Sequence, residues 1–365
     1  MTPKRLLIAA GGTGGHMFPA RAAADALIAR GWSVKLVTDA RGAKHARDFP
    51  GDGVTEIEAS SPFSKNPVKM AQSVMKLTTG VFQARRILAE YKPHVVAGFG
   101  GYPAFPVLTA AWMNSVPRVI HEQNAVLGRV NRLFAGSVVS VASGFTRLDK
   151  MPDSAVHAVT GNPVRAQVLQ AREVEYEPPQ PGGEIRLLVL GGSLGARILS
   201  ETVPRAVAAL PEDLRLRLKV VQQTREESLD SARTIYADAG VQAELSPFFR
   251  DMGRLYAETH LVISRSGASS VSEISAIGRP ALFVPLAIAM DDHQTANAQG
   301  LVKVGAADMM TEAEFTVDNL RARLETLLAD GEALDARARL ARTEGRPDAH
   351  ERLADLIIQA AEPKT

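Results

Sequence analysis

The sequence predicts an α/β protein of two domains, each built around a parallel β-sheet with helices on both faces. Three observations predict this class: the chain length, the alternation of short apolar runs with longer amphipathic segments, and a strand–glycine–helix pattern that occurs twice. The 365 residues exceed one typical domain, so two units that each bury a core are expected.

Short runs rich in Val, Ile and Leu mark the expected strands. They cover residues 6–10, 34–38, 94–98, 118–121 and 137–141 in the first half, and 187–190, 216–222, 261–264 and 281–284 in the second. A Gly-Asn-Pro turn at 161–163 and a Pro- and Gly-rich stretch at 177–183 separate the two series. The second domain is therefore expected to begin near residue 162.

The composition excludes several classes of function. Lys and Arg total 42 against 40 for Asp and Glu, which disfavours affinity of the whole protein for nucleic acid. The absence of cysteine excludes disulfides, thiol nucleophiles and Cys-based metal sites, and is compatible with a reducing cytosol. The apolar stretch after Lys4 and Arg5 ends at Gly11, too early for a signal peptide, and the apolar run 281–290 is shorter than the ~20 residues that span a bilayer. Any membrane contact is therefore expected to be peripheral.

The repeated pattern consists of two glycine loops, each following a strand. Leu-Leu-Ile-Ala-Ala leads into Gly-Gly-Thr-Gly-Gly at 11–15, and Leu-Leu-Val-Leu leads into Gly-Gly-Ser-Leu-Gly at 191–195. Such loops let the backbone approach a phosphate at a helix N-terminus, although tight strand–helix packing alone is the alternative. Neither loop matches the dinucleotide fingerprint or a P-loop. The simplest architecture is two Rossmann-like domains facing across a cleft, with ligands at the carboxyl ends of the strands.

A third glycine cluster and a histidine are further candidate site residues of the first domain. Gly-Phe-Gly-Gly-Tyr at 98–102 ends another strand, which suggests a second phosphate site on the same domain or, alternatively, an ordinary turn closed by Pro103. His16 is expected in the first turn of the helix that follows Gly15. A histidine beside a phosphate loop is a candidate general base for an acceptor hydroxyl, although a structural role is the alternative.

Polar residues follow another strand of the first domain at His121-Glu122-Gln123-Asn124. The second histidine of a zinc helix is absent, because residue 125 is Ala. The cluster is expected to hydrogen-bond a sugar, with Asn124 the best candidate, or else to support its own loop.

In the second domain, small polar residues open a helix after the strand at 261–264 and leave room for a bulky ligand. Glu273 is a candidate to accept hydrogen bonds from ribose hydroxyls, or alternatively complements the helix dipole. Gln294 begins a further helix and is a candidate sugar contact. The neighbouring pair Asp291 and Asp292 is expected to cap that helix, and no metal site is predicted.

Residues 59–89 contain no Asp or Glu, while basic and apolar side chains alternate along them. Helical spacing of the apolar residues suits a core-facing helix, but the absence of acids favours an interface with anionic lipid. The residues assigned to this surface are Lys65, Lys69, Met75, Lys76, Leu77, Val81, Phe82 and Arg85.

Together these motifs resemble a family of bacterial GT-B glycosyltransferases that complete the lipid-linked peptidoglycan precursor. The resemblance covers nearly the whole chain, and the ordered set of motifs is specific although each one alone is weak. The motifs are Gly-Gly-Thr-Gly-Gly-His at 11–16, Gly-Phe-Gly-Gly-Tyr at 98–102, His-Glu-Gln-Asn at 121–124, Gly-Asn-Pro-Val-Arg at 161–165, Gly-Gly-Ser-Leu-Gly-Ala-Arg at 191–197, and Arg-Ser-Gly-Ala at 265–268 continuing to Ser272 and Glu273.

The resemblance implies domains at 1–161 for acceptor and membrane and at 162–344 for a UDP-sugar, with 345–365 crossing back to the first as a helix. It implies inverting transfer of N-acetylglucosamine from UDP-N-acetylglucosamine to the C4 hydroxyl of the undecaprenyl-diphosphate-linked N-acetylmuramyl-pentapeptide. This reaction would take place peripherally on the anionic cytoplasmic face of the plasma membrane, with no metal, cofactor or nucleic acid.

The resemblance also assigns residues. His16 would be the base, and Gly100, Gly101 and Tyr102 would bind the acceptor diphosphate. The donor contacts would be Thr13, Gly14, Gly15, Asn124, Arg165, Ser193, Phe249, Ala268, Ser269, Ser270, Val271, Ser272, Glu273 and Gln294. A related glycolipid transferase or a UDP-sugar epimerase of the same fold remains the alternative.

Overall fold

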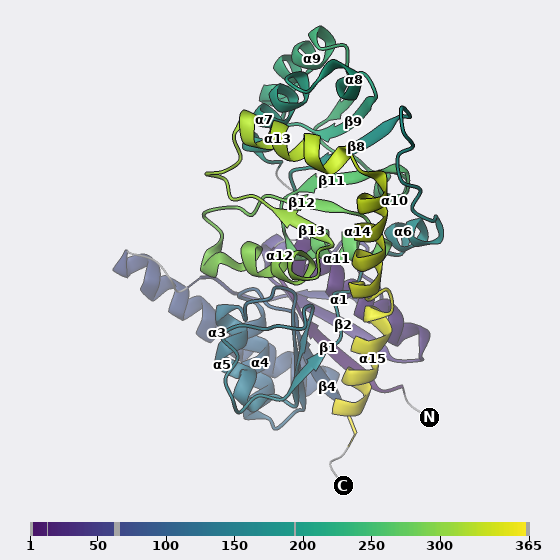
Figure 1. The fold of residues 1–365 in the computed structure, drawn as a ribbon. Helices are drawn as coiled ribbons and strands as arrows, with labels where there is room; N and C mark the ends of the chain where they lie inside the picture. Colours follow the sequence, from purple (N-terminus) through teal and green to yellow (C-terminus); the bar gives the residue numbers. More distant parts are fainter. Residues whose placement is uncertain (1–2, 13, 62–65, 193–194, 363–365) are drawn as a thin grey trace. The chain divides into compact units, whose positions relative to one another are not determined.

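The computed structural model describes residues 3–12, 14–61, 66–192 and 195–362. The chain divides into two compact units: Met1–Val164 together with Pro347–Thr365 form unit 1, and Arg165–Arg346 form unit 2. Each unit has a parallel sheet between helices (Figure 1), which confirms the predicted α/β class.

In unit 1 the described strands form a seven-stranded sheet in the order β3-β2-β1-β4-β5-β6-β7. These strands are β1 (Arg5–Ala9), β2 (Ser33–Thr38), β3 (Val54–Glu56), β4 (Val95–Gly98), β5 (Arg118–Glu122), β6 (Ser140–Ser143) and β7 (His157–Val159). Every neighbouring pair is parallel, so the carboxyl ends of all seven strands meet at one edge. The central strands are buried on both faces, which explains their continuous apolar sequences.

Helices cover both faces of this sheet. α1 (Gly14–Ala29) and α15 (Ala349–Ala360) pack against one face, so the terminal helix belongs to unit 1 (Figure 1). α3 (Pro67–Tyr91), α4 (Ala104–Met113) and α5 (Arg129–Phe134) lie on the other. The short elements are α2 (Ala40–Ala43) and the 3-10 helix η1 (Ala135–Ser137).

In unit 2 the described strands form a six-stranded parallel sheet in the order β10-β9-β8-β11-β12-β13. They are β8 (Ile185–Leu190), β9 (Leu218–Gln223), β10 (Gln242–Ser246), β11 (Leu261–Ser264), β12 (Ala281–Phe283) and β13 (Ala307–Met309). The longer helices are α7 (Arg197–Ala208), α9 (Leu229–Asp238), α10 (Met252–Glu258), α11 (Ala268–Ile277), α12 (His293–Lys303), α13 (Val317–Leu328) and α14 (Gly331–Glu344). The short ones are α6 (Ala166–Leu169), η2 (Gln170–Glu173), α8 (Glu212–Arg215), η3 (Glu226–Ser228) and η4 (Met290–Asp292).

Local signals in the sequence set the ends of two helices near the candidate site. The side chain of Asn66 accepts hydrogen bonds from the amides of Val68 and Lys69, and Pro67 occupies the first helical position of α3. α11 ends at Gly278, whose φ of 81° is left-handed. Among the described residues, none of the helices combines the length and the apolar character that crossing a bilayer requires.

The structure corrects some predicted boundaries. The expected strand at 137–141 starts only at Ser140, because Ser137 ends the 3-10 helix η1. Asp291 and Asp292 precede α12 but adopt left-handed φ, and Asp292 accepts a hydrogen bond from the Thr295 hydroxyl at 2.7 Å instead of from a backbone N–H. The expectation that this acidic pair caps the helix is therefore wrong for Asp292.

Candidate functional site

In unit 1 the two glycine loops lie against each other at the carboxyl ends of β1 and β4. A Cβ atom on Gly101 would lie 2.7 Å from the carbonyl oxygen of Gly11, and one on Gly11 would lie 2.4 Å from Cγ of Pro103. Gly12, Gly100 and Gly101 have φ values of 88°, 89° and 76°. Both loops therefore require glycine for conformation and for close approach.

The remaining predicted residues of these loops surround this contact. Gly14 begins α1, and Gly15 is exposed in its first turn. Tyr102 is half-buried, and its hydroxyl accepts a hydrogen bond from Ser61 at 2.9 Å. Thr13 lies outside the described residues.

His16 lies in the first turn of α1 beside the second glycine loop. Its ring is half-buried, and a Cβ atom on Gly100 would lie 3.0 Å from its Cε1. Its Nδ1 is 2.9 Å from Oε1 of Gln123, which follows β5. The structure therefore places the candidate base at both glycine loops and connects it to a buried polar cluster.

The polar cluster at 121–124 is mostly buried. His121, Glu122 and Gln123 are 1%, 2% and 4% exposed, whereas Asn124 is half-buried. Burial lowers the pKa of His121 to about 4, so this ring is neutral near pH 7. Within the cluster, Glu122 thus supports the loop, His121 and Gln123 form a buried hydrogen-bonded line to His16, and Asn124 is the half-buried member that a sugar could reach.

Glu122 organises the loop between β5 and α5. Its carboxylate accepts hydrogen bonds from the amide of Asn124 at 3.1 Å, the amide of Gly128 at 2.8 Å and Nδ2 of Asn131 at 2.8 Å. A buried carboxylate with several donors is a stable loop anchor. It orients Asn124, because Nδ2 of Asn124 also lies 3.3 Å from Glu122 Oε1.

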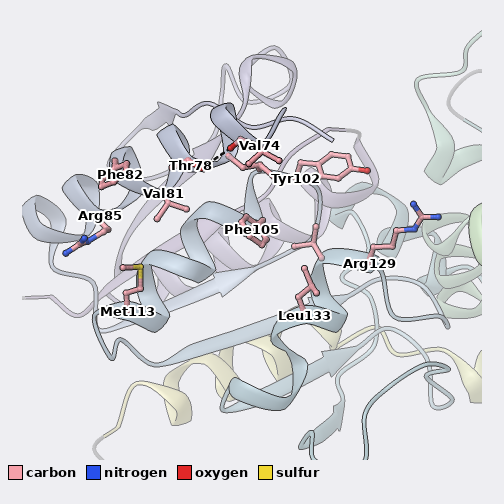
Figure 2. Close-up of a pocket in the computed structure, with 12 residues that line it drawn as sticks. Val74, Thr78, Val81, Phe82, Arg85, Tyr102, Phe105, Met113, Arg129 and Leu133 are labelled. Atoms are coloured by element: carbon pink, nitrogen blue, oxygen red, sulfur yellow. Dashed lines mark hydrogen bonds between the residues drawn. The ribbon is translucent and has the colours of Figure 1, made fainter. Parts of the chain in front are cut away.

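Helices α3, α4 and α5 form an apolar groove of about 500 Å³ on the outer face of unit 1 (Figure 2). Arg85 and Arg129 lie near opposite ends of it, and Phe105 lies near its middle. It is lined by Val74, Leu77, Thr78, Val81, Phe82, Arg85, Tyr102, Phe105, Met113, Arg129, Val130 and Leu133.

The residues predicted for a membrane surface divide between this groove and its margins. Met75 and Phe82 are 71% and 65% exposed, whereas Leu77 is only 8% exposed and is therefore part of the packed side of α3. Lys69 and Arg85 are exposed. Lys76 forms an ion pair with Glu58 at 3.5 Å. Lys65 lies outside the described residues.

In unit 2 one glutamine ties the glycine loop to its neighbours. Gly192 has a φ of 83°, and a Cβ atom on Gly191 would lie 2.3 Å from the amide nitrogen of Ala196. Oε1 of Gln223 accepts a hydrogen bond from the Gly191 amide at 3.0 Å. Its Nε2 donates to the carbonyls of Gly192 at 3.0 Å and Pro247 at 3.1 Å. Ser193 lies outside the described residues.

Two predicted donor contacts of unit 2 bind each other. Nη2 and Nε of Arg165 lie 2.8 and 2.9 Å from Oε1 of Glu273, and the Tyr256 hydroxyl donates to Oε2 at 3.3 Å. Glu273 is 7% exposed, and this burial raises its pKa, while Arg165 and Tyr256 oppose the rise. Arg165 fixes the carboxylate of Glu273, which belongs to the second turn of α11.

The other predicted contacts lie after the carboxyl ends of β10, β11 and β12. Ala268, Ser270 and Ser272 are half-buried on α11, Ser269 is exposed, and Val271 is buried. The side chain of Val271 therefore packs in the core, which leaves only its backbone for a ligand. Oε1 of Gln294 accepts a hydrogen bond from the Leu286 amide at 3.0 Å, and Phe249 is half-buried.

Gln223 and Tyr256 were not predicted as site residues from the sequence, and Gln123 was named without its contact with His16. Gln223 directly follows a predicted strand, so its position at the ligand edge was a usable signal. The role of Tyr256 lacked any local signal, because it depends on a contact with Glu273 on another helix.

Comparison with known proteins gives consistent matches over both units. Residues 6–143 match the glycosyltransferase family 28 N-terminal domain, and residues 186–353 match the glycosyltransferase family 28 C-terminal domain. The chain is 60% identical to a Maricaulis maris protein named UDP-N-acetylglucosamine–N-acetylmuramyl-(pentapeptide) pyrophosphoryl-undecaprenol N-acetylglucosamine transferase, over 98% of both chains. A Phenylobacterium zucineum protein with the same name is 49% identical over 98% of this chain and 99% of its own.

A solved structure agrees with these matches. The crystal structure of Acinetobacter baumannii MurG is 32% identical to this chain, with a TM-score of 0.81 over 98% of this chain and all of the other.

Proposed function

Because the chain belongs to glycosyltransferase family 28, we propose that it transfers N-acetylglucosamine from UDP-N-acetylglucosamine to undecaprenyl-diphosphate-linked N-acetylmuramyl-pentapeptide. Full-length identity of 60% to a relative named for this reaction supports the substrate pair. The structural observation that carries the proposal is the position of His16 against two glycine loops at one sheet edge.

In unit 1, His16 is the general base. It takes the proton from the C4 hydroxyl of the muramyl sugar while that oxygen bonds to the anomeric carbon of N-acetylglucosamine and the bond from this carbon to the UDP oxygen breaks. The configuration inverts, and UDP leaves with the electron pair. The backbone of Gly100 and Gly101, with Tyr102, binds the acceptor diphosphate, because close-packed glycine loops present amide groups to phosphate oxygens.

In unit 2 the donor nucleotide binds at the carboxyl ends of the strands. Glu273, which Arg165 orients, accepts hydrogen bonds from the ribose hydroxyls. The backbone near Phe249 contacts the uracil, and Gln294 contacts the sugar. The glycine loop at 191–195 and the start of α11 (Ala268, Ser269, Ser270, Val271 and Ser272) stabilise the charge on the leaving diphosphate. Arg165 and Ser193 complete this set, and Thr13, Gly14, Gly15 and Asn124 are further proposed contacts of the donor.

The groove face of unit 1 docks on the anionic cytoplasmic face of the membrane. Met75, Phe82 and Leu133 are 71%, 65% and 68% exposed around a groove that is lined mostly by apolar side chains. Lys69 and Arg85 supply positive charge beside it. Exposed apolar side chains flanked by basic ones favour a surface of anionic lipid over a neutral one. This surface would bring His16 and the glycine loops to a lipid-linked acceptor.

Vesicle binding tests the docking surface. The double variant Phe82→Ser/Leu133→Ser should lose most cosedimentation with vesicles of phosphatidylglycerol and phosphatidylcholine. Leu216→Ser is the matched control, because Leu216 is 58% exposed in unit 2 and should be dispensable. Equal binding of the double variant and the control would contradict the surface, as would equal binding of wild type to purely zwitterionic vesicles.

Transfer of label tests the reaction. The protein is incubated with radiolabelled UDP-N-acetylglucosamine and the lipid-linked muramyl acceptor, with EDTA present throughout. We expect label in the lipid phase and release of UDP. Label that stays in the aqueous phase, or that requires a diacylglycerol acceptor, would refute the proposed substrates.

A further inference from the structure

A line of three hydrogen bonds connects His16 to the main-chain carbonyl of Gly161, which follows β7. Nδ1 of His16 lies 2.9 Å from Oε1 of Gln123, and Nε2 of Gln123 lies 3.0 Å from Nδ1 of His121. Nε2 of His121 then lies 3.2 Å from the carbonyl oxygen of Gly161. Apart from His16, these side chains are more than nine-tenths buried.

The proton positions along this line follow from its two ends. A carbonyl oxygen only accepts hydrogen bonds, so Nε2 of the neutral His121 must donate to Gly161, which leaves Nδ1 of His121 as an acceptor. The amide NH₂ of Gln123 must face that acceptor. The carbonyl oxygen of His121, 3.3 Å from Nε2 of Gln123, independently requires the same orientation.

This orientation determines the tautomer of His16. Oε1 of Gln123 faces Nδ1 of His16 and can only accept, so the neutral imidazole carries its proton on Nδ1. The lone pair is then on Nε2, for which the described part of the chain supplies no hydrogen-bond partner. In water, neutral histidine favours the opposite tautomer, so the protein reverses the intrinsic preference.

We propose that Gln123 and His121 are positioning residues that hold His16 with Nε2 unprotonated, ready to accept a proton. The proposal rests on the assignment of His16 as the base in the proposed function. Without the side-chain amide of Gln123, His16 could adopt the Nε2-protonated tautomer. In that tautomer Nε2 cannot take the proton from the hydroxyl of the acceptor substrate.

The tautomer of His16 can be read without any activity measurement. In ¹⁵N-labelled protein above pH 7, two-bond ¹H–¹⁵N correlation spectra distinguish a protonated Nδ1 from a protonated Nε2 in each histidine. We expect His16 to be mainly Nδ1-protonated in the wild type and to shift towards Nε2 protonation in Gln123→Met. A wild-type His16 that is mainly Nε2-protonated, or an unchanged tautomer in Gln123→Met, would overturn the proposal.

Kinetics separate positioning from a merely structural effect. Gln123→Met should lower kcat about tenfold or more with little change in KM for the UDP-sugar, because the base is misaligned while the donor site is intact. Gln123→Glu keeps an acceptor for Nδ1 and should restore the Nδ1-protonated tautomer and part of kcat.

The matched control is Ser143→Ala on the neighbouring strand. Ser143 is fully buried, donates to the carbonyl of Phe145 at 2.7 Å and lies 2.7 Å from Nε2 of His157, but does not contact His16. If Ser143→Ala and Gln123→Met lower kcat equally, the effect is structural and the proposal fails. If the tautomer is as expected but the wild type transfers no sugar, the proposed function fails instead.

Discussion

The two glycine loops of the molecule share one backbone device but are held in different ways. Gly12 and Gly192 have nearly the same left-handed φ, 88° and 83°, directly after the first strand of each unit. In unit 1 the loop is held by close packing against Pro103 and Gly101, whereas in unit 2 the side chain of Gln223 hydrogen-bonds it. The same left-handed φ is therefore accompanied by close packing in one unit and by side-chain hydrogen bonds in the other.

The side chains around the two glycine loops also differ. In unit 1 a histidine in the following helix is connected to a neutral, buried hydrogen-bond line, which suits it to accept a proton. In unit 2 an ion pair fixes a buried carboxylate within α11, which suits recognition of hydroxyl groups, while the N-terminus of this helix suits phosphate. In the proposed function, unit 1 therefore supplies the base and the acceptor site, and unit 2 supplies recognition of the donor.

The largest expected effect separates these two roles. His16→Ala should lower kcat by about 10²- to 10⁴-fold, the usual contribution of a general base, while the Kd for the UDP-sugar stays unchanged. Steady-state rates and calorimetric titration measure the two quantities. If His16→Ala lowered the affinity for the UDP-sugar as much as it lowered kcat, His16 would bind the donor rather than move a proton.

Glu273→Gln should affect donor binding more than kcat, the opposite of His16→Ala. Loss of the charged acceptor should weaken UDP-sugar binding about 10- to 100-fold, with kcat at saturating donor affected less. Asp308→Asn is the control, because Asp308 pairs with Arg323 and Arg337 in the same unit, each at 3.1 Å. If both variants weaken donor binding alike, the effect comes from general destabilisation of unit 2.

Gln223→Leu tests the polar clamp. The change removes hydrogen bonds to Gly191, Gly192 and Pro247 and leaves the buried amide of Gly191 unpaired, at a cost of about 1–3 kcal/mol in unfolding free energy. Donor affinity should fall by about tenfold as the loop loosens. Urea denaturation and titration with UDP measure these effects. A variant with wild-type stability and affinity would show that packing alone holds this loop.

The smallest expected effect concerns acid stability, because each unit contains a histidine whose pKa burial lowers to about 4. Burial lowers the pKa values of His121 and His260 to about 4, below the ordinary value of 6.5. Between these values the unfolded chain binds protons that the native rings do not, so stability falls as pH falls from 6.5 towards 4. Each group contributes a slope of at most about 1.4 kcal/mol per pH unit.

Denaturation at pH 7 and pH 5 measures this slope. His121→Phe and a change at His260 should each reduce it to a similar extent, because burial lowers both pKa values to about 4. Stability that rises on acidification, or an unaltered slope in His121→Phe, would contradict the neutral state of His121.

Much of the fold could be predicted from the sequence, for a physical reason. Central strands such as β1 and β11 are buried on both faces and are therefore continuous apolar runs. The edge strands β3, β7, β10 and β13 were missed, because most of their residues are exposed or only partly buried and their sequences are mixed.

The candidate site was predictable only where the backbone itself gives the signal. The glycines at 11–15 predicted a phosphate-binding loop, and His16 follows them directly in the sequence. The ion pair between Arg165 and Glu273 joins residues 108 positions apart, and the burial of Glu122 and Gln123 depends on packing by other strands and helices. Such contacts have no local signature, so the sequence could not separate the buried members of the polar cluster from the accessible Asn124.

The division between the units can be tested most directly by mapping UDP binding on amide resonances. In ¹⁵N-labelled protein, we expect UDP to shift the amide resonances of Gly191, Gly192, Gly267 and Glu273 most strongly. The amide resonances of Gly12 and Gly100 should change little. Strongest shifts at Gly12, His16 and Gly100 would contradict this division, because the nucleotide would then occupy the unit assigned to the acceptor.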